Sequence, residues 1–302
     1  GGEIQKVFHT IDGGKTFEAF DTDGVANTIH FLDSQTGYIG MQEARIFKTV
    51  DGGDSWTLLF PLTGTAVRDI SFSPGSTTGY CCGDNCTVHK IMENSLLKIE
   101  SIFVSNLYSV SAVSSNEALA CGEDIAVHIL DEEIINDQGA PCSSAQDLVC
   151  FDGGIGYMVG SDGWNNTFGV VKETNNLALW TLNFEFDKDR TVLNTVHFLN
   201  ESEGWAAGFD GIIIHTKDGG ASWEVNSSFS TETYQYFWQE IFFTSPTNGF
   251  VVGQYHDVDK NYGKIYKFTE LSGIADQNGE IAFEIYPNPA KDFVIIETGS
   301  FD

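Results

Sequence analysis

The chain has 302 residues, of which 41% are hydrophobic, 13% are aromatic and 32 are glycine. It carries 43 acidic and 15 basic residues, and the resulting net charge of −28 repels nucleic-acid phosphates and anionic membranes. No apolar run of the sequence reaches the length of a membrane span. We therefore expect no nucleic-acid partner and no membrane insertion.

An eight-residue pattern, T-x-D-x-G-x-[ST]-[FW], begins at Thr10 and returns at residues 49–56 and 216–223. In each copy we expect the Asp to accept backbone N–H groups of its own turn, the glycine to supply a positive φ, and the aromatic residue to fill the space beneath. These roles fall on Asp12, Gly14, Phe17, Asp51, Gly53, Trp56, Asp218, Gly220 and Trp223. The pattern resembles the Asp-box, or BNR repeat, which implies a turn between the two outer strands of a β-propeller blade.

The same residues also set a longer period. Asp12 and Asp51 lie 39 positions apart, and Asp218 lies 167 beyond Asp51, which is close to four units of about 42 residues. A second marker has the same period: an apolar inner strand, a Gly-aromatic pair, and a further glycine. We expect that glycine to let neighbouring blades approach closely; the residues are Gly40, Gly83, Gly122, Gly160, Gly208 and Gly253.

These repeats predict an all-β fold, with a single β-propeller of four-stranded blades over residues 1–270. Six units have an inner strand, whereas residues 1–20 supply only the outer half of another. We favour seven blades. The alternative is six, with the N-terminal piece completing the last blade.

Six cysteines are present, and their spacing does not form the paired CxxC elements of a structural zinc site. Cys82 and Cys86 flank a predicted turn and could form a disulfide across it, and Cys142 and Cys150 could close a loop. For Cys81 and Cys121, buried thiols within strands are an equally good interpretation.

Aromatic residues that depart from the repeat are candidates for ligand binding. Trp164 lies in an enlarged loop, and Tyr234, Tyr236 and Trp238 cluster just before the last inner strand. Such side chains stack on sugar rings or bind peptides, although packing beneath a long loop explains them equally well.

Sialidases also contain Asp-boxes, and resemblance to them would require three arginines that clasp a carboxylate and a Tyr nucleophile. The chain has three arginines, of which Arg68 and Arg190 each precede an inner strand. Surface arginines are the simpler interpretation, and no nucleophile pair is recognisable. We name no catalytic residue and expect that the protein is not an enzyme, with a sialidase-like glycoside hydrolase as the alternative.

Residues 256–263 place oxygen-bearing side chains at alternate positions, as a calcium loop does. The candidate ligands are Asp257, Asp259 and Asn261. The spacing departs from an EF-hand, so a solvated hairpin loop is the preferred interpretation. We expect no cofactor, with Ca²⁺ at this loop as the alternative.

The units of the form x-h-F-x-[DN]-x-x-x-G-[WY]-x-x-G followed by T-x-D-G-G-x-[ST]-W resemble the Ycf48-like photosystem II assembly factor family. The resemblance covers about residues 1–270 and implies a binding scaffold for other proteins. We accordingly predict a non-enzymatic binding module for a protein or carbohydrate ligand.

The repeat stops near residue 270, and residues 271–280 read as a polar linker. Residues 285–292 follow, and they resemble the opening of the type A sorting domain of the type IX secretion system. The motif residues are Tyr286, Pro287, Asn288 and Pro289. The resemblance implies that residues 281–302 begin an incomplete β-sandwich sorting domain. It further implies a Bacteroidetes-type Gram-negative bacterium, type IX secretion machinery as a partner, and location outside the cell or on its surface.

Overall fold

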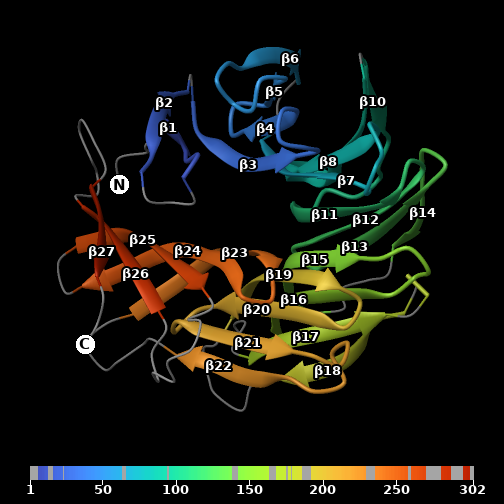
Figure 1. Cartoon of the computed structure of the whole chain (residues 1–302). Coiled ribbons are helices and arrows are strands. Elements are labelled where there is room, and N and C mark those ends of the chain that lie inside the picture. Colours follow the sequence, from blue (N-terminus) through green and yellow to red (C-terminus); the bar gives the residue numbers. More distant parts are fainter. Residues whose placement is uncertain are drawn as a thin grey trace.

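The structure is a computed structural model in which strands follow one another around a ring (Figure 1). It describes residues 6–12, 16–22, 24–62, 66–93, 95–137, 142–162, 168–174, 176–177, 179–185, 192–228, 235–257, 260–269, 280–286 and 295–299. Within these ranges every regular element is a strand except one 3-10 turn, η1 (Asp84–Cys86). None of the described helices is long and apolar enough to cross a membrane.

Five antiparallel sheets have four strands each, and we number them as blades in chain order. Blade 1 comprises β3 (Ala26–Phe31), β4 (Gly37–Met41), β5 (Arg45–Thr49) and β6 (Thr57–Pro61). Blade 2 comprises β7 (Val67–Phe72), β8 (Gly79–Gly83), β9 (Thr87–Met92) and β10 (Ser95–Ile99). Blade 3 comprises β11 (Leu107–Ser114), β12 (Glu117–Gly122), β13 (Ile125–Leu130) and β14 (Glu133–Asp137).

The remaining sheets continue this order. Blade 4 comprises β15 (Ser144–Cys150), β16 (Gly156–Asp162), β17 (Phe168–Thr174) and β18 (Thr181–Glu185). Blade 5 comprises β19 (Leu193–Asn200), β20 (Glu203–Gly208), β21 (Ile212–Thr216) and β22 (Glu224–Ser228). The last sheet has five strands: β23 (Gln235–Ser245), β24 (Asn248–Asp257), β25 (Lys260–Thr269), β26 (Glu280–Tyr286) and β27 (Ile295–Gly299). The N-terminal hairpin is β1 (Lys6–His9) with β2 (Glu18–Asp21).

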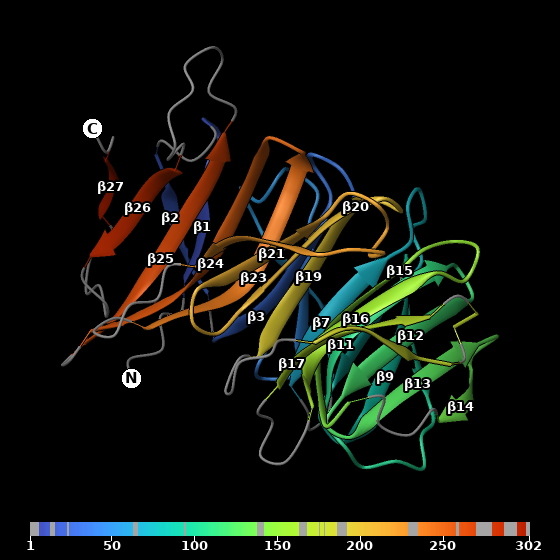
Figure 2. The ribbon, with the colours of Figure 1, turned by 90° about the horizontal axis from the view of Figure 1, so that it is seen from below.

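The all-β propeller with four-stranded blades is confirmed, but the predicted number of blades, seven or alternatively six, is wrong, because five sheets form four-stranded blades. In the described chain the N-terminal hairpin forms a two-stranded sheet of its own. It does not complete the last sheet, because β26 occupies the place beside β25. Figures 1 and 2 show the hairpin beside that sheet, near the chain's red C-terminal strands.

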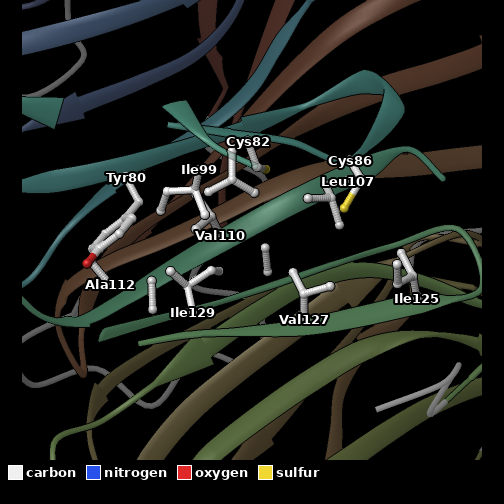
Figure 3. Packing of buried hydrophobic residues seen from close by; sticks show 13 residues of the cluster. Tyr80, Cys82, Cys86, Ile99, Leu107, Val110, Ala112, Ile125, Val127 and Ile129 are labelled. Carbon is white, nitrogen blue, oxygen red and sulfur yellow. The ribbon is translucent and has the colours of Figure 1, made fainter. Parts of the chain in front are cut away.

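The hydrophobic core is divided into five clusters, one between each consecutive pair of sheets from blade 1 to the last sheet. Figure 3 shows the cluster between blades 2 and 3, where Tyr80 and Cys82 face Val110 and Ile129. Because blades 1 and 3 cover both faces of blade 2, its second strand, β8, is buried at every position. Such strands lose the alternation of polar and apolar residues that a half-exposed strand shows.

The recurrent glycine near the end of the second strand has a different role from the one predicted. A Cβ on Gly208 would lie 1.9 Å from the carbonyl oxygen of Val192, just before the inner strand of its own blade. The equivalent contacts for Gly83 and Gly122 are also 1.9 Å. The glycine therefore makes room within its own sheet. Gly40 is the exception, since its Cβ would meet Val67 of blade 2.

All six cysteines are buried and none forms a disulfide. The proposed Cys142–Cys150 bridge is wrong because β15 is extended between them, and its six residue steps span about 20 Å. Cys82 and Cys86 likewise remain thiols and pack in one apolar cluster. Burial raises the pKa of the Cys81 thiol to about 12, which keeps that thiol protonated.

Candidate functional site

Each inner strand of the ring has a β-bulge near its start, and one polar residue follows each bulge. The bulges lie between Ala26 and Thr28 in blade 1 and at equivalent places in the other four blades and the last sheet. The residues after them alternate between a hydroxyl and a carboxylate around the ring: Thr28, Asp69, Ser109, Asp147, Thr195 and Glu240. We call this set the polar belt.

Local chain geometry places these residues. In blade 5, the carbonyl of Val192 accepts the backbone N–H of Phe209 at 2.8 Å, and Thr195 follows three positions later. In blade 3, Asn106 O accepts the N–H of Glu123 at 3.0 Å, and Ser109 follows three positions later. The glycine of the second strand permits this close approach, so the contact that accompanies the bulge also positions the belt residue in blades 3 and 5.

Hydrogen bonds connect the belt across blades. Thr28 Oγ1 donates to Asp69 Oδ1 at 3.1 Å. Ser109 Oγ lies 3.1 Å from Asp69 Oδ2 and 2.7 Å from Asp147 Oδ1, so it bridges blades 2 and 4. Thr195 Oγ1 donates to Glu240 Oε1 at 3.1 Å. These contacts join side chains about 40 residues apart in the sequence.

Backbone amides complete two further links. The N–H of Val110 donates to Asp69 Oδ2 at 2.9 Å, and the N–H of Val196 donates to Asp147 Oδ2 at 2.8 Å. Each carboxylate therefore holds the inner strand of the following blade. Buried carboxylates need such donors, because an unsatisfied charge in the interior is costly.

The environment of the belt favours protonated carboxyl groups. Burial and the neighbouring Asp69 charge raise the pKa of Asp147 to about 6. The side chain of Glu240 is exposed at the surface, but the surrounding protein displaces part of its hydration shell. This loss of hydration and the charges of Asp147 and Asp69 raise the pKa of Glu240 to about 8. A hydroxyl has one hydrogen, so Ser109 can donate to only one of its two carboxylate neighbours at a time. When Asp147 is protonated, below its pKa of about 6, its own proton can supply the second bond.

The described residues contain no group of three or more His, Cys, Asp or Glu that could hold a metal ion. Of the predicted calcium ligands, Asp257 ends β24 and Asn261 pairs with His256 in the β24–β25 hairpin. Asp259 lies outside the described residues.

Two of the three eight-residue repeats connect the third and fourth strands of a blade, at β5–β6 and β21–β22, and the first connects the two strands of the N-terminal hairpin, β1 and β2. In the second, Asp51 Oδ1 accepts the N–H of Ser55 at 2.9 Å, and Thr49 Oγ1 accepts the N–H of Gly53 at the same distance. Hydrogen bonds from Ser55 and Thr49 lower the pKa of Asp51 to about 2. Gly53 has φ +99° and Gly220 has φ +79°.

In the third repeat, Asp218 accepts hydrogen bonds from Ser222, and Trp223 donates its indole N–H to Asn183 of the preceding blade at 2.8 Å. In the first, Asp12 accepts the N–H of Thr16 at 2.9 Å and Phe17 leads into β2, while Gly14 lies outside the described residues. We refer to all three segments as box turns.

Of the six predicted ligand-binding side chains, the structure describes Arg68, Tyr236 and Trp238. Trp238 is fully buried between blade 5 and the last sheet, which agrees with the packing interpretation of this side chain. Tyr236 is half-buried and packs against the same cluster, 5.5 Å from Trp238 between ring centroids. Arg68 Nε forms an ion pair with Asp84 at 2.9 Å. The other three candidates, Trp164, Arg190 and Tyr234, lie outside the described residues.

Of the sorting motif, Tyr286 ends β26, whereas Pro287, Asn288 and Pro289 lie outside the described residues. The sequence interpretation also missed the polar belt. The repeat does contain a signal for the belt. Each member stands three positions before the residue that ends the inner-strand motif, as Thr28 does before Phe31 and Asp69 does before Phe72. That position varies among Thr, Ser, Asp and Glu, so no single residue type marks it.

Comparisons with known proteins also point to a propeller built from repeats. The family model described as "Photosynthesis system II assembly factor YCF48" matches residues 171–268. The chain is similar to YCF48 proteins. The structure titled "YCF48 bound to D1 peptide" is 17% identical, with a TM-score of 0.65 over 90% of this chain and 87% of that one.

Two further solved structures have the same fold. YCF48 from Cyanidioschyzon merolae is 15% identical, with a TM-score of 0.62 over 87% of this chain and 88% of that one. The WD40 β-propeller domain of Doa1 is 12% identical, with a TM-score of 0.67 over 89% of this chain and 88% of that one. No curated protein sequence matches the chain. At these identities the structural likeness establishes a propeller, while the family match covers the blade 4 to last-sheet region.

Proposed function

We propose that the protein is a non-enzymatic propeller that binds a protein partner and supports assembly of a complex. The observation that carries this proposal is the family match over residues 171–268, combined with a similar propeller whose structure contains a bound peptide. Propellers serve many functions, so the fold by itself would not select this one.

The hydrogen bonds made by the polar groups of the repeat support a structural rather than a chemical role for these groups. Belt carboxylates hold amides of adjacent blades, and the box-turn Asp residues hold their own turns. The alternative, a sialidase-like hydrolase, would need Arg68 to clasp a substrate carboxylate. Asp84 already occupies that guanidinium group at 2.9 Å. Within the same non-enzymatic proposal, the alternative is that the propeller binds a glycan in place of a protein.

Affinity capture followed by reconstitution tests the proposal. The immobilised chain is exposed to an extract of its source cells, captured proteins are identified by mass spectrometry, and each is purified and titrated by calorimetry. We expect at least one partner with saturable binding. Because the chain carries −28 charges, we expect affinity for a basic partner to fall as salt rises.

A fluorogenic sialoside assay gives the opposing result. Turnover that is abolished by Arg68→Ala, in a variant that melts like the parent, would overturn the non-enzymatic proposal. Arg45→Ala is the matched control, since Arg45 contacts Glu43 at 3.5 Å in the outer part of blade 1.

We also propose export by the type IX system, with delivery outside the cell or to the surface of a Bacteroidetes-type bacterium. The motif at residues 285–292 supports this, and so does the acidic composition. Replacing Pro287 and Pro289 by Ala in the source organism should retain the protein inside the cell. Unchanged export, measured by immunoblot of the medium and cell surface, would contradict the proposal.

A further inference from the structure

The connection between blades 2 and 3 is fixed to a turn on either side of it. Residues 100–106 link β10 to β11, and the carbonyl of Ser105 accepts the backbone N–H of Cys86, in η1, at 2.6 Å. The carbonyl of Asn106 accepts the N–H of Glu123, in the β12–β13 turn, at 3.0 Å. Three connections therefore meet at one end of these two blades. We call residues 84–86, 100–106 and 123–124 the shoulder.

Two aliphatic side chains of the shoulder face solvent. Ile102 is 91% exposed and Val104 is 79% exposed. Phe103, between them, packs against the buried cluster of blades 2 and 3 that Figure 3 shows. Its backbone N–H donates to Ser101 Oγ at 3.0 Å. Because neighbouring side chains of an extended chain point in opposite directions, the inward position of Phe103 turns both aliphatic side chains outward.

The exposed aliphatic pair lies on a segment whose position is already set. The segment is held by the ring of Phe103, by the two backbone hydrogen bonds of Ser105 and Asn106, and by the N–H of Asn85, which donates to Asn106 Oδ1 at 3.3 Å. Removing apolar surface from water is favourable. A ligand that covers the pair gains this benefit without first having to order the segment.

The shoulder also has an excess of negative charge. Its acidic side chains are Asp84, Glu100, Glu123 and Asp124. Two of the four are neutralised, since Arg68 pairs with Asp84 at 2.9 Å and Lys98 pairs with Glu100 at 3.1 Å. Glu123 and Asp124 are exposed, and within the described ranges no basic side chain forms an ion pair with either. Two carboxylates are therefore available to a cationic ligand.

Tyr108 lies beside these charges. It is the bulged residue of β11 and is half-buried. Burial and the charges of Glu123 and Asp84 raise the pKa of its phenol, whereas Arg68 acts in the opposite direction. The hydroxyl therefore stays protonated at neutral pH and can donate a hydrogen bond. The shoulder thus combines exposed aliphatic groups, a phenol and carboxylates that lack a cation.

We propose that the shoulder binds an extended segment of a partner protein in which an apolar residue is closely followed by lysine or arginine. The apolar side chain packs on Ile102 and Val104, and the cation reaches the carboxylates of Glu123 and Asp124. This inference rests on the proposed protein-binding function and assigns that function a surface.

Charge decides between the possible occupants of this surface. Each copy of the chain carries −28 charges, so two copies repel each other, and an anionic membrane surface is repelled as well. A basic segment of a partner meets a field of the opposite sign, which speeds its encounter with the protein at low salt. The aliphatic pair and the free carboxylates therefore favour the same ligand.

Selection from a phage-displayed library of random peptides tests the inference on the whole folded chain. The protein is immobilised, bound phage are eluted, and enriched peptides are synthesised and titrated by calorimetry. We expect enriched sequences in which an apolar residue is followed closely by lysine or arginine, with a Kd on the order of 10 μM. Hydrogen exchange at the amides of residues 102–104 and 124 should slow when such a peptide binds.

Substitution of the aliphatic pair separates the shoulder from other apolar surfaces. Ile102→Asp should weaken peptide binding at least about tenfold, and Ile102→Val should retain most of it. Because Ile102 is exposed, the variant should melt like the parent. Leu179→Asp makes a similar change of polarity at a residue that is 70% exposed beside blade 4. This matched control should leave binding unchanged.

Neutral variants test the two carboxylates. Glu123→Gln combined with Asp124→Asn should weaken binding at least about threefold and reduce its salt dependence. Asp124 has a φ of +54°, which Asn tolerates, so the turn is preserved. Glu93→Gln combined with Glu201→Gln removes the same charge from the β9–β10 and β19–β20 turns, at the opposite end of the blades. This control should leave the affinity within about twofold of the parent.

Three results would refute the shoulder as the binding surface. They are a selection that enriches no peptide, enriched peptides that lack basic residues, and binding that Ile102→Asp leaves intact in a variant that melts like the parent. If Ile102→Asp fails to fold, slower exchange confined to amides outside the shoulder refutes it on the parent chain. A captured partner whose affinity is insensitive to Ile102→Asp would sustain the proposed function while excluding this surface.

Discussion

The threonine that begins each box turn makes more contacts than the aspartate pattern suggests. Thr216 is 1% exposed, its Oγ1 donates to Asp218 Oδ1 at 2.9 Å, and it accepts the buried N–H of Gly220 at 2.8 Å. Thr49 makes the same contacts with Asp51 and Gly53. The hydroxyl therefore accepts a hydrogen bond from a buried amide N–H that would otherwise have no acceptor.

We predict that Thr216→Val lowers the free energy of unfolding by about 2 kcal/mol, because the amide of Gly220 loses its acceptor while remaining buried. Urea denaturation measures the change. Thr57→Val, at an exposed position of β6, is the control and should stay within about 0.5 kcal/mol of the parent. Equal losses in the two variants would refute the role assigned to the hydroxyl.

Residues of this kind are accessible to sequence interpretation, because the partners in a box turn lie within four positions of one another. The belt is different. Asp69 contacts Ser109 from 40 positions away, and the side chains involved have no shared residue type. Trp238 shows a related limit of the sequence: its position before the apolar motif of the last inner strand resembles a loop, whereas β23 begins at Gln235 and carries the side chain into the core.

At the scale of single elements, the glycine of the second strand determines the path of the inner strand. Any side chain on Gly208 would collide with the carbonyl of Val192, three residues before Thr195 of the belt. Blade 1 shows another solution, since Met41 pairs with Ala26 there and Gly40 pairs with Thr28. The sequence shows the period of the glycines. The reason for the period depends on the register between the first and second strands of a blade, which only the structure shows.

We predict that Gly208→Ala destabilises the fold by roughly 2–3 kcal/mol, because the backbone of β19 must move to admit the methyl group. Thermal and urea unfolding report the loss. Gly75→Ala is the comparison, since a Cβ there meets nothing within 4 Å and only its φ of +73° opposes the change, at about 1 kcal/mol. If Gly208→Ala costs no more than Gly75→Ala, the close carbonyl contact does not constrain β19.

At the scale of the whole molecule, the belt links all five blades and the last sheet through carboxyl groups whose pKa values are raised. Unfolded Asp and Glu titrate near pH 4. Groups with a higher pKa in the fold bind protons more tightly there, so their contribution to stability is complete at low pH and is lost as pH rises through the folded pKa. For Asp147 and Glu240 the loss extends from about pH 4 through pH 6 and pH 8 respectively.

We therefore predict that the melting temperature falls between pH 5 and pH 8, and that Glu240→Gln flattens the upper part of this decline. Measurements in high salt reduce the contribution of the surface charge. Glu224→Gln, on an exposed position of β22, removes the same formal charge and should leave the slope unchanged. A slope that both variants alter equally would assign the effect to net charge and not to the belt.

The alternation of hydroxyl and carboxylate around the belt has an evolutionary consequence. Duplicating one blade would place two carboxylates or two hydroxyls next to each other in the belt. Two adjacent carboxylates lack the hydroxyl that donates a hydrogen bond, and two adjacent hydroxyls lack the carboxylate that accepts one. Duplicating two adjacent blades preserves the order. Propellers of this type should therefore gain or lose repeats in pairs, and designed variants with an added Asp-Ser pair of blades should fold where single insertions do not.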